Sequence, residues 1–136
     1  MTTAGYQEVE HTADWAIRVR APGLSELFRQ AALGMFALMG AEPADGSIKW
    51  RRVDLAADDL ETLLVDWLQD LLFAQETRNR MPDQIEIDVD GSARLRGRVR
   101  ERPSGRPDKP IKAVTYHLMV IEQTDNGLET LVVFDV

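Results

Sequence analysis

The chain has 136 residues, 44% of them hydrophobic, and this size and composition suit one domain with one core over residues 1–136. The absence of cysteine excludes disulfides, thiolate metal sites and thiol nucleophiles. The net charge of −7 disfavours independent binding to a phosphate backbone, which relies on lysine and arginine. The first residues lack a signal-peptide pattern and no apolar run could span a membrane, so we expect a cytoplasmic protein.

The first third of the chain predicts two paired strands and a helix. Apolar and polar residues alternate over 15–20, which is typical of a strand with one buried face, and residues 6–10 are expected to pair with it. From Leu24 to Met39 the apolar residues recur at helical spacing, and Gly40 offers a C-terminal stop. A second segment of this kind begins after a short strand expected at 48–55.

That second helix is predicted to start at a cap formed by Asp58 with Glu61 and to end near Thr77. Its leucines and Trp67 recur at three and four residues, while acidic and polar residues occupy the other side. Both predicted helices are therefore amphipathic.

A charged β-hairpin follows, in which Ile85, Ile87 and Val89 alternate with acidic residues and 93–99 alternate with arginines. We prefer a three-residue loop, Asp90–Ser92, because a two-residue loop would set Ile87 against Arg94. Asp88 then opposes Arg94 and Glu86 opposes Arg96. These pairs would form an exposed ladder in which each pair contributes at most ~1 kcal/mol.

The last third predicts an exposed, mobile loop over 101–110 and a final hairpin of residues 111–123 and 128–136. An Asn126-Gly127 turn would set Leu118 opposite Asp135. Five to seven strands and two helices predict an α+β fold, with a single-layer, mostly antiparallel β-sheet and both amphipathic helices packed on one face.

Candidate chemistry is limited to a few polar residues in unusual positions. The sequence has no nucleophile elbow, P-loop, dinucleotide glycine motif or HExxH helix, and a structural role is the favoured interpretation of His11 and His117. Asp14 interrupts the connection between two strands, and Asp135 lies one residue before Val136, the last residue printed. Lys112 and Asp135 are expected to share one sheet face, either as a partly buried ion pair or as part of a cation site built from carboxylates.

Five segments in the order found here make the chain resemble the archease family, the accessory proteins of RtcB-type RNA ligases. They are HTAD at 11–14, the helical segments 27–39 and 59–68, KAVTYH at 112–117, and the final Phe-Asp-Val at 134–136. The resemblance runs from Tyr6 to Val136. Two features depart from the family pattern: Trp15, where a smaller residue is expected, and the arginine-rich strip.

The resemblance implies a function in tRNA splicing or RNA repair, where the ligase joins a 2′,3′-cyclic phosphate or 3′-phosphate end to a 5′-hydroxyl using GTP and Mn²⁺. The chain would be no enzyme itself but an activator that promotes guanylylation and multiple turnover of the ligase, contacting RNA through it. The functional residues implied are Asp14, Lys112 and Asp135. The metal ligands implied are Asp14, Asp135 and the terminal carboxylate of Val136, holding a divalent cation, with Ca²⁺ expected first and Mg²⁺ or Mn²⁺ as alternatives.

Two other hypotheses stay open. Eight of the sixteen basic residues lie between Arg94 and Lys112, where Glu101 and Asp108 are the acidic residues. The strip 98–109 could therefore hold RNA phosphates in an RNA-binding or RNA-modification helper. A small metal-dependent enzyme is the third hypothesis, because carboxylate-bound cations can activate water. A convincing general base or nucleophile is missing for it.

Overall fold

The computed structural model describes residues 3–9 and 15–136, which contain two helices and eight strands. In chain order these elements are β1 (Gly5–Val9), β2 (Trp15–Ala21), α1 (Leu24–Met39), β3 (Lys49–Ala56), α2 (Leu60–Arg78), β4 (Arg80–Asp90), β5 (Arg94–Pro103), β6 (Ala113–Thr115), β7 (Glu122–Thr124) and β8 (Gly127–Asp135). Neither helix is long and apolar enough to cross a membrane.

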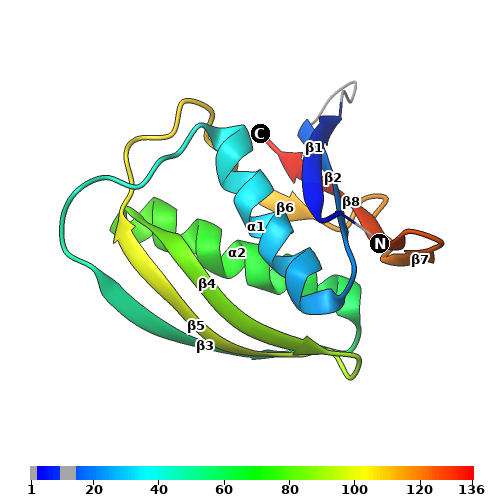
Figure 1. Ribbon diagram of the computed structural model, residues 1–136. Helices are drawn as coiled ribbons and strands as arrows, with labels where there is room; N and C mark the ends of the chain where they lie inside the picture. Colours follow the sequence, from blue (N-terminus) through cyan, green and yellow to red (C-terminus); the bar gives the residue numbers. More distant parts are fainter. Residues whose placement is uncertain (1–2, 10–14) are drawn as a thin grey trace.

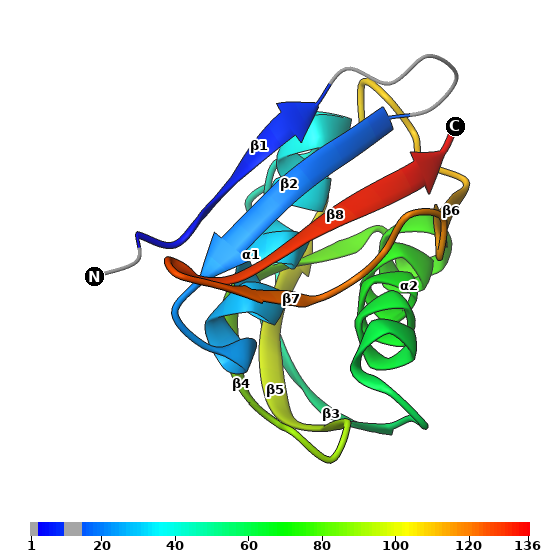
Figure 2. The ribbon, with the colours of Figure 1, turned by 90° about the vertical axis from the view of Figure 1, so that its right-hand side faces the viewer.

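The strands form two antiparallel sheets with the helices between them (Figures 1 and 2). One sheet has the order β1-β2-β8-β6, with β7 also paired to β8, and the other has the order β3-β5-β4. Helix α1 contacts β1, β2 and β8 of the first sheet and β4 of the second, while α2 contacts β3, β4 and β6. The predicted α+β fold is confirmed, with antiparallel strands and two helices.

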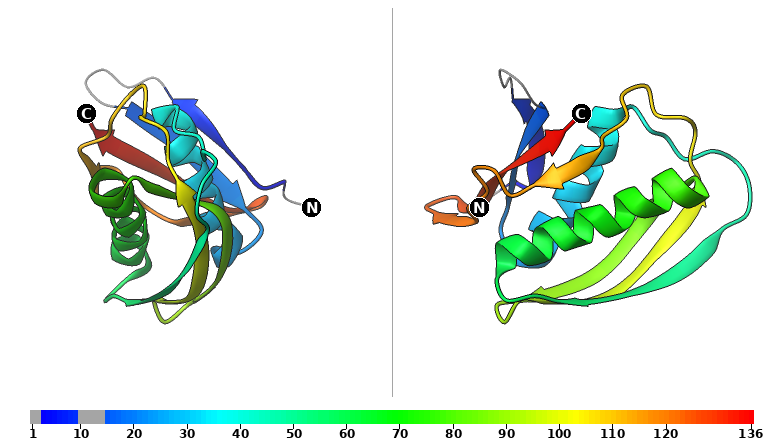
Figure 3. Two further views of the ribbon diagram at one scale, coloured as in Figure 1. Left: turned by 90° about the vertical axis from the view of Figure 1, so that its left-hand side faces the viewer. Right: turned by 180° about the vertical axis from the view of Figure 1, so that it is seen from behind.

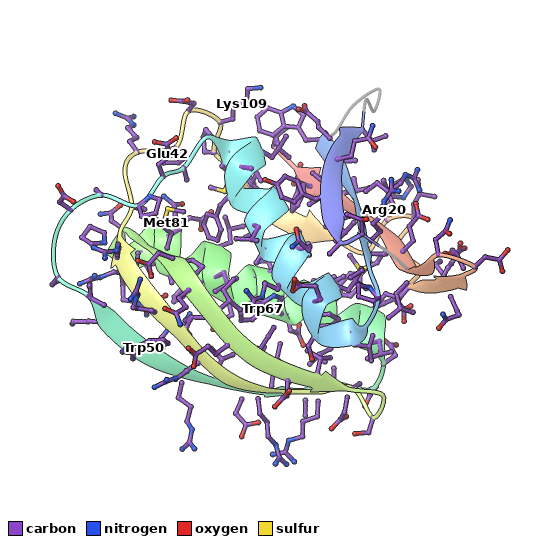
Figure 4. All side chains as sticks on the ribbon, viewed as in Figure 1. Arg20, Glu42, Trp50, Trp67, Met81 and Lys109 are labelled. Atoms are coloured by element: carbon purple, nitrogen blue, oxygen red, sulfur yellow. The ribbon has the colours of Figure 1, made fainter. Side chains whose placement is uncertain are left out.

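The expected single sheet layer is wrong, because α1 is buried on more than one side. Its buried residues are Leu27, Phe28, Ala31, Ala32, Gly34, Met35, Phe36, Leu38 and Met39. So wide an apolar surface needs partners in two directions, which one sheet cannot supply. Trp67 of α2 joins the two helices: its side chain is fully buried and its indole N–H donates to the carbonyl oxygen of Phe28 at 2.9 Å (labelled in Figure 4).

The predicted helix ends are nearly those observed. Helix α1 ends at Gly40, whose φ of 68° lies in the left-handed region that glycine adopts without strain. Helix α2 is capped by Asp59 instead of Asp58, since the Asp59 carboxylate accepts the Thr62 N–H at 2.7 Å. The helix runs to Arg78 and stops at Asn79, which also has a positive φ.

The β4–β5 hairpin has the predicted faces but a register shifted by two residues. Asp88 pairs with Arg96 and Glu86 with Arg98, so the predicted pairing of Asp88 with Arg94 is wrong. The loop is residues 91–93, because Ala93 takes a φ of 61° and its N–H donates to the carbonyl oxygen of Asp90 at 3.2 Å. A shift of two preserves the side-chain alternation. The exposed charge ladder is therefore confirmed with different partners.

The final hairpin also differs from the prediction, because its first strand is interrupted. Gly127 pairs with Thr124, so the turn residues are 125–126, and Asp135 pairs with Ala113 instead of Leu118. Residues 116–121 leave the ladder between β6 and β7, and Leu118 takes a φ of 59° there. Turn chemistry at one end of a strand thus did not determine pairing at its other end.

Candidate functional site

The end of β8 lies between two other strands, and this brings distant parts of the chain together (Figure 2). Phe134 is fully buried and is paired with Trp15 of β2 on one side and with Val114 of β6 on the other. A buried aromatic side chain in a central strand fixes the position of the residues that follow it. Asp135 is therefore held at the sheet end where β2 begins and β6 begins.

Lys112 and Asp135 are joined through their backbones. The Lys112 N–H donates to the carbonyl oxygen of Asp135 at 2.8 Å, directly before Ala113 pairs with Asp135. Both residues are exposed, and within the described part of the chain their side chains form no ion pair with each other. The expected partly buried ion pair is thus wrong. One carboxylate and one ammonium group are instead presented to solvent at the same sheet end.

Asp14, the third predicted residue, lies outside the described residues together with His11. Its neighbour in the chain, Trp15, is paired with Phe134, the neighbour of Asp135. His117 lies in a turn after β6, exposed to solvent, and its backbone N–H donates to the Thr115 hydroxyl oxygen at 3.2 Å.

The oxygen atoms available at this sheet end are of the chemical type that binds hard divalent cations. Asp135 is exposed, Val136 is 37% exposed, and carboxylate oxygens are the ligands that Ca²⁺, Mg²⁺ and Mn²⁺ favour. Over residues 3–9 and 15–136, no group of three histidine, cysteine, aspartate or glutamate side chains comes together. The described part of the predicted set is thus Asp135 with Val136, and Asp14 would have to complete it.

Lys109 is a neighbour of this end that the sequence did not single out. Its ammonium nitrogen lies 5.3 Å from the ring centroid of Trp15, within the range of a cation–π contact. Figure 4 labels Lys109 beyond the C-terminal end of α1, where its backbone N–H donates to the carbonyl oxygen of Met39 at 3.0 Å. The departure at Trp15 and the basic strip were the available signals, but their contact depends on the fold.

The segment 101–110, expected to be an exposed mobile loop, begins as regular structure. Residues up to Pro103 belong to β5, and Ser104 forms an isolated bridge with Pro43. The Gly105 N–H then donates to the carbonyl oxygen of Glu42 at 3.0 Å. The basic strip is consequently divided: Arg98 and Arg100 lie on the three-stranded sheet, whereas Lys109 lies beside Trp15.

Comparisons with known proteins agree on one family. The family model for the archease protein family matches residues 6–136. A protein archease of Saccharolobus islandicus is 33% identical over 141 residues, covering 96% of this chain and 98% of the relative. The protein archease of Methanosarcina mazei is 32% identical, covering 96% and 95%.

Solved structures give the same result. The crystal structure of an archease from Thermotoga maritima, described as a possible chaperone, has a TM-score of 0.70 and 27% identity, covering 94% of each chain. The solution structure of a protein from Methanobacterium thermoautotrophicum has a TM-score of 0.69 and 30% identity, covering 97% of this chain and 99% of that one. Since the family model spans nearly the whole sequence, this chain belongs to the archease family.

Proposed function

We propose that this chain is a cytoplasmic accessory protein, without catalysis of its own, that activates an RtcB-type RNA ligase in tRNA splicing or RNA repair. In this proposal it promotes guanylylation and multiple turnover of the ligase, and it meets RNA through the ligase. Membership of the archease family supports an accessory role. The description of the Thermotoga maritima relative as a possible chaperone also fits a protein that acts on another.

One observation supports the choice of residues: β8 pairs with β2 and β6, so Trp15, Lys112 and Asp135 come from three distant segments to one sheet end. Phe134 is opposite Trp15, and the Lys112 N–H donates to the carbonyl oxygen of Asp135 at 2.8 Å. Asp14 lies outside the described residues and enters the proposal as the residue that precedes Trp15 in the sequence.

Within the proposal, Asp14, Asp135 and the main-chain carboxylate of Val136 would hold one divalent cation, Ca²⁺ first and Mg²⁺ or Mn²⁺ as alternatives. The Asp135 side chain is exposed, and no hydrogen-bond or ion-pair partner among the described residues occupies its oxygens. When bound, a cation supplies positive charge that neutralises carboxylates and attracts phosphate oxygens.

Lys112 would supply a second positive charge from the protein itself. Its side chain is exposed while its backbone is tied to Asp135, so the ammonium group can reach a partner without losing its position on the sheet. A lysine of this kind neutralises developing or bound phosphate charge. The edge would thus present carboxylates, a cation and an ammonium group to the guanylylation site of the ligase.

The experiment is multiple-turnover joining of a cyclic-phosphate RNA to a 5′-hydroxyl RNA by a partner ligase, with guanylylation measured in parallel. Asp14→Ala, Lys112→Ala and Asp135→Asn should each abolish the stimulation. Asp14→Ala removes a proposed metal ligand, Lys112→Ala removes the ammonium group, and Asp135→Asn removes the negative charge of a proposed metal ligand. Arg94→Ala is the matched control, since Arg94 lies on the distant charge ladder and should leave stimulation at the wild-type level.

Melting curves of all four variants should match the wild type apart from any cation effect. If the three variants stimulate guanylylation as wild type does, the proposed residues are wrong, although the family assignment stands. If wild type itself fails to stimulate the ligase, the accessory role is wrong.

A further inference from the structure

The outer face of the three-stranded sheet is a separate feature, remote from Asp135. Helix α2 lies along one face of this sheet in both views of Figure 3. Leu95 and Val99 of β5 are buried against the helices, while the alternate residues Arg96 and Arg98 point to the other face. That face contains a pocket of about 640 Å³, whose lining includes Trp50, Arg52, Arg96 and Arg98 together with Asp54, Glu86 and Asp88.

Most arginines of this face are already paired with carboxylates. The Arg98 Nε donates to Glu86 at 2.9 Å, and Arg94 lies 3.5 Å from Asp54. Arg100 and Arg102 both donate to Asp83. These pairs belong to the charge ladder and need no ligand.

Arg52 is different, because it lies directly opposite another arginine. The register of β3 and β5 pairs Arg52 with Arg98. The carboxylate partner of Arg98 is Glu86 of β4, which lies on the other side of β5 from β3. Arg52 is exposed and has no hydrogen-bond or ion-pair partner within residues 3–9 and 15–136. Like charges directly opposed on neighbouring strands are destabilising; Glu86 compensates the charge of Arg98, and an anion bound at Arg52 would compensate the other.

An aromatic surface adjoins this cation. Trp50 precedes Arg52 by two residues, so both side chains are on the same face, and Trp50 is 43% exposed (labelled in Figure 4). The Arg98 guanidinium carbon lies 4.0 Å from the centroid of the Trp50 ring, and Glu86 holds that guanidinium from the other side. Stacked tryptophan and arginine planes are the kind of platform on which nucleobases stack.

We infer that this face binds a nucleotide unit, with a phosphate at Arg52 and the base on the Trp50–Arg98 platform. A bare anion would make no use of an exposed tryptophan, and an apolar ligand would make none of an arginine that has no partner among the described residues. The unit could be a free nucleotide or one residue of a single-stranded nucleic acid, which share this chemistry. The net charge of −7 means that affinity comes from local stacking and pairing instead of a long-range field.

The test uses fluorescence anisotropy of a labelled short oligouridylate RNA with the full chain at low ionic strength. Trp50→Ala should weaken binding by roughly 5- to 100-fold through lost stacking, and Trp50→Phe should restore most of it. Arg52→Ala should weaken binding and flatten the slope of log K against log salt by about 0.7, the value for one phosphate contact to a single strand. Arg94→Ala, on the same strand as Arg98 but outside the pocket lining, should bind as wild type does.

Competition identifies the source of the ligand. Displacement by uridine monophosphate but not by uridine or inorganic phosphate would support a free nucleotide, and displacement by oligouridylate alone would support a single strand. Displacement by polyglutamate with no effect of Trp50→Ala would overturn the inference in favour of an acidic protein segment. Absence of binding by wild type would also overturn the inference. So would binding as tight as wild type by both Trp50→Ala and Arg52→Ala, with unchanged melting curves.

Discussion

Gly97 occupies a place in the central strand of the three-stranded sheet where no side chain fits. A Cβ added there would lie 2.0 Å from the carbonyl oxygen of Glu86 and 2.7 Å from the Cα of Ile87. Ordinary carbon–oxygen contact is about 3.3 Å, so the two strands would have to separate by roughly 1 Å. Both obstructing atoms belong to the backbone, which cannot move aside as a flexible side chain would.

We therefore predict that Gly97→Ala destabilises the protein by about 3 kcal/mol or more, at the upper end of overpacking effects. Equilibrium urea unfolding followed by circular dichroism measures this change, and the midpoint should fall by about 1–3 M for a typical m-value. Gly91→Ala is the matched control, because nothing lies within 4 Å of an added Cβ at this hairpin position, and it should change stability by less than about 0.5 kcal/mol. Equal midpoints for the two variants would refute the steric argument.

Three further outcomes are expected. Millimolar Ca²⁺ or Mn²⁺ should raise the melting temperature of wild type but not of Asp135→Ala, because a ligand of the native state alone stabilises it; unchanged curves for both proteins would contradict the cation site. A few residues added after Val136 should impair ligase stimulation while leaving the melting curve unchanged, and a fully active extended protein would show that this carboxylate is not needed. Hydrogen bonds from Arg100, and to a lesser extent from Arg102, hold the pKa of the Asp83 carboxyl below its usual value. Asp83→Asn should therefore lower the free energy of unfolding above the usual pKa of about 4, and this loss should shrink as the pH falls below that value and wild-type Asp83 becomes protonated. A loss that stays constant down to acid pH would exclude the ion pair as its source.

A partly buried charge network links α2 to the sheet that carries Gly97 and Trp50. Arg51 points toward the helices, opposite in direction to its neighbours Trp50 and Arg52, and contacts Asp70 of α2 at 2.8 Å and Glu101 of β5 at 3.1 Å. Glu101 is nearly fully buried, so loss of Arg51 would leave an uncompensated carboxylate, which is strongly destabilising. Arg51 and Trp50 are adjacent in β3, so the charge network and the proposed nucleotide face share this strand.

Local patterns in the sequence determined much of this molecule. Helical spacing from Leu24 to Met39 and a glycine at position 40 predicted α1 as observed, since both signals act within a few residues. Period-two alternation predicted β2 and the two faces of the β4–β5 hairpin for the same reason. Three motifs, HTAD at 11–14, KAVTYH at 112–117 and Phe-Asp-Val at 134–136, indicated the family, which the comparisons confirmed.

Tertiary structure decided the rest, because it depends on contacts between residues far apart in the chain. Periodicity marks a buried face but not the layer that covers it, so the split into two sheets around α1 was not predictable. The registers of the two hairpins depend on the positive φ of Ala93 and on the break after β6, where Leu118 has a positive φ. Such residues change the number of residues in a loop, and composition does not reveal this. Pairing of Arg52 with Arg98, and of Phe134 with Trp15, exists only once these registers are set, and both candidate surfaces depend on it.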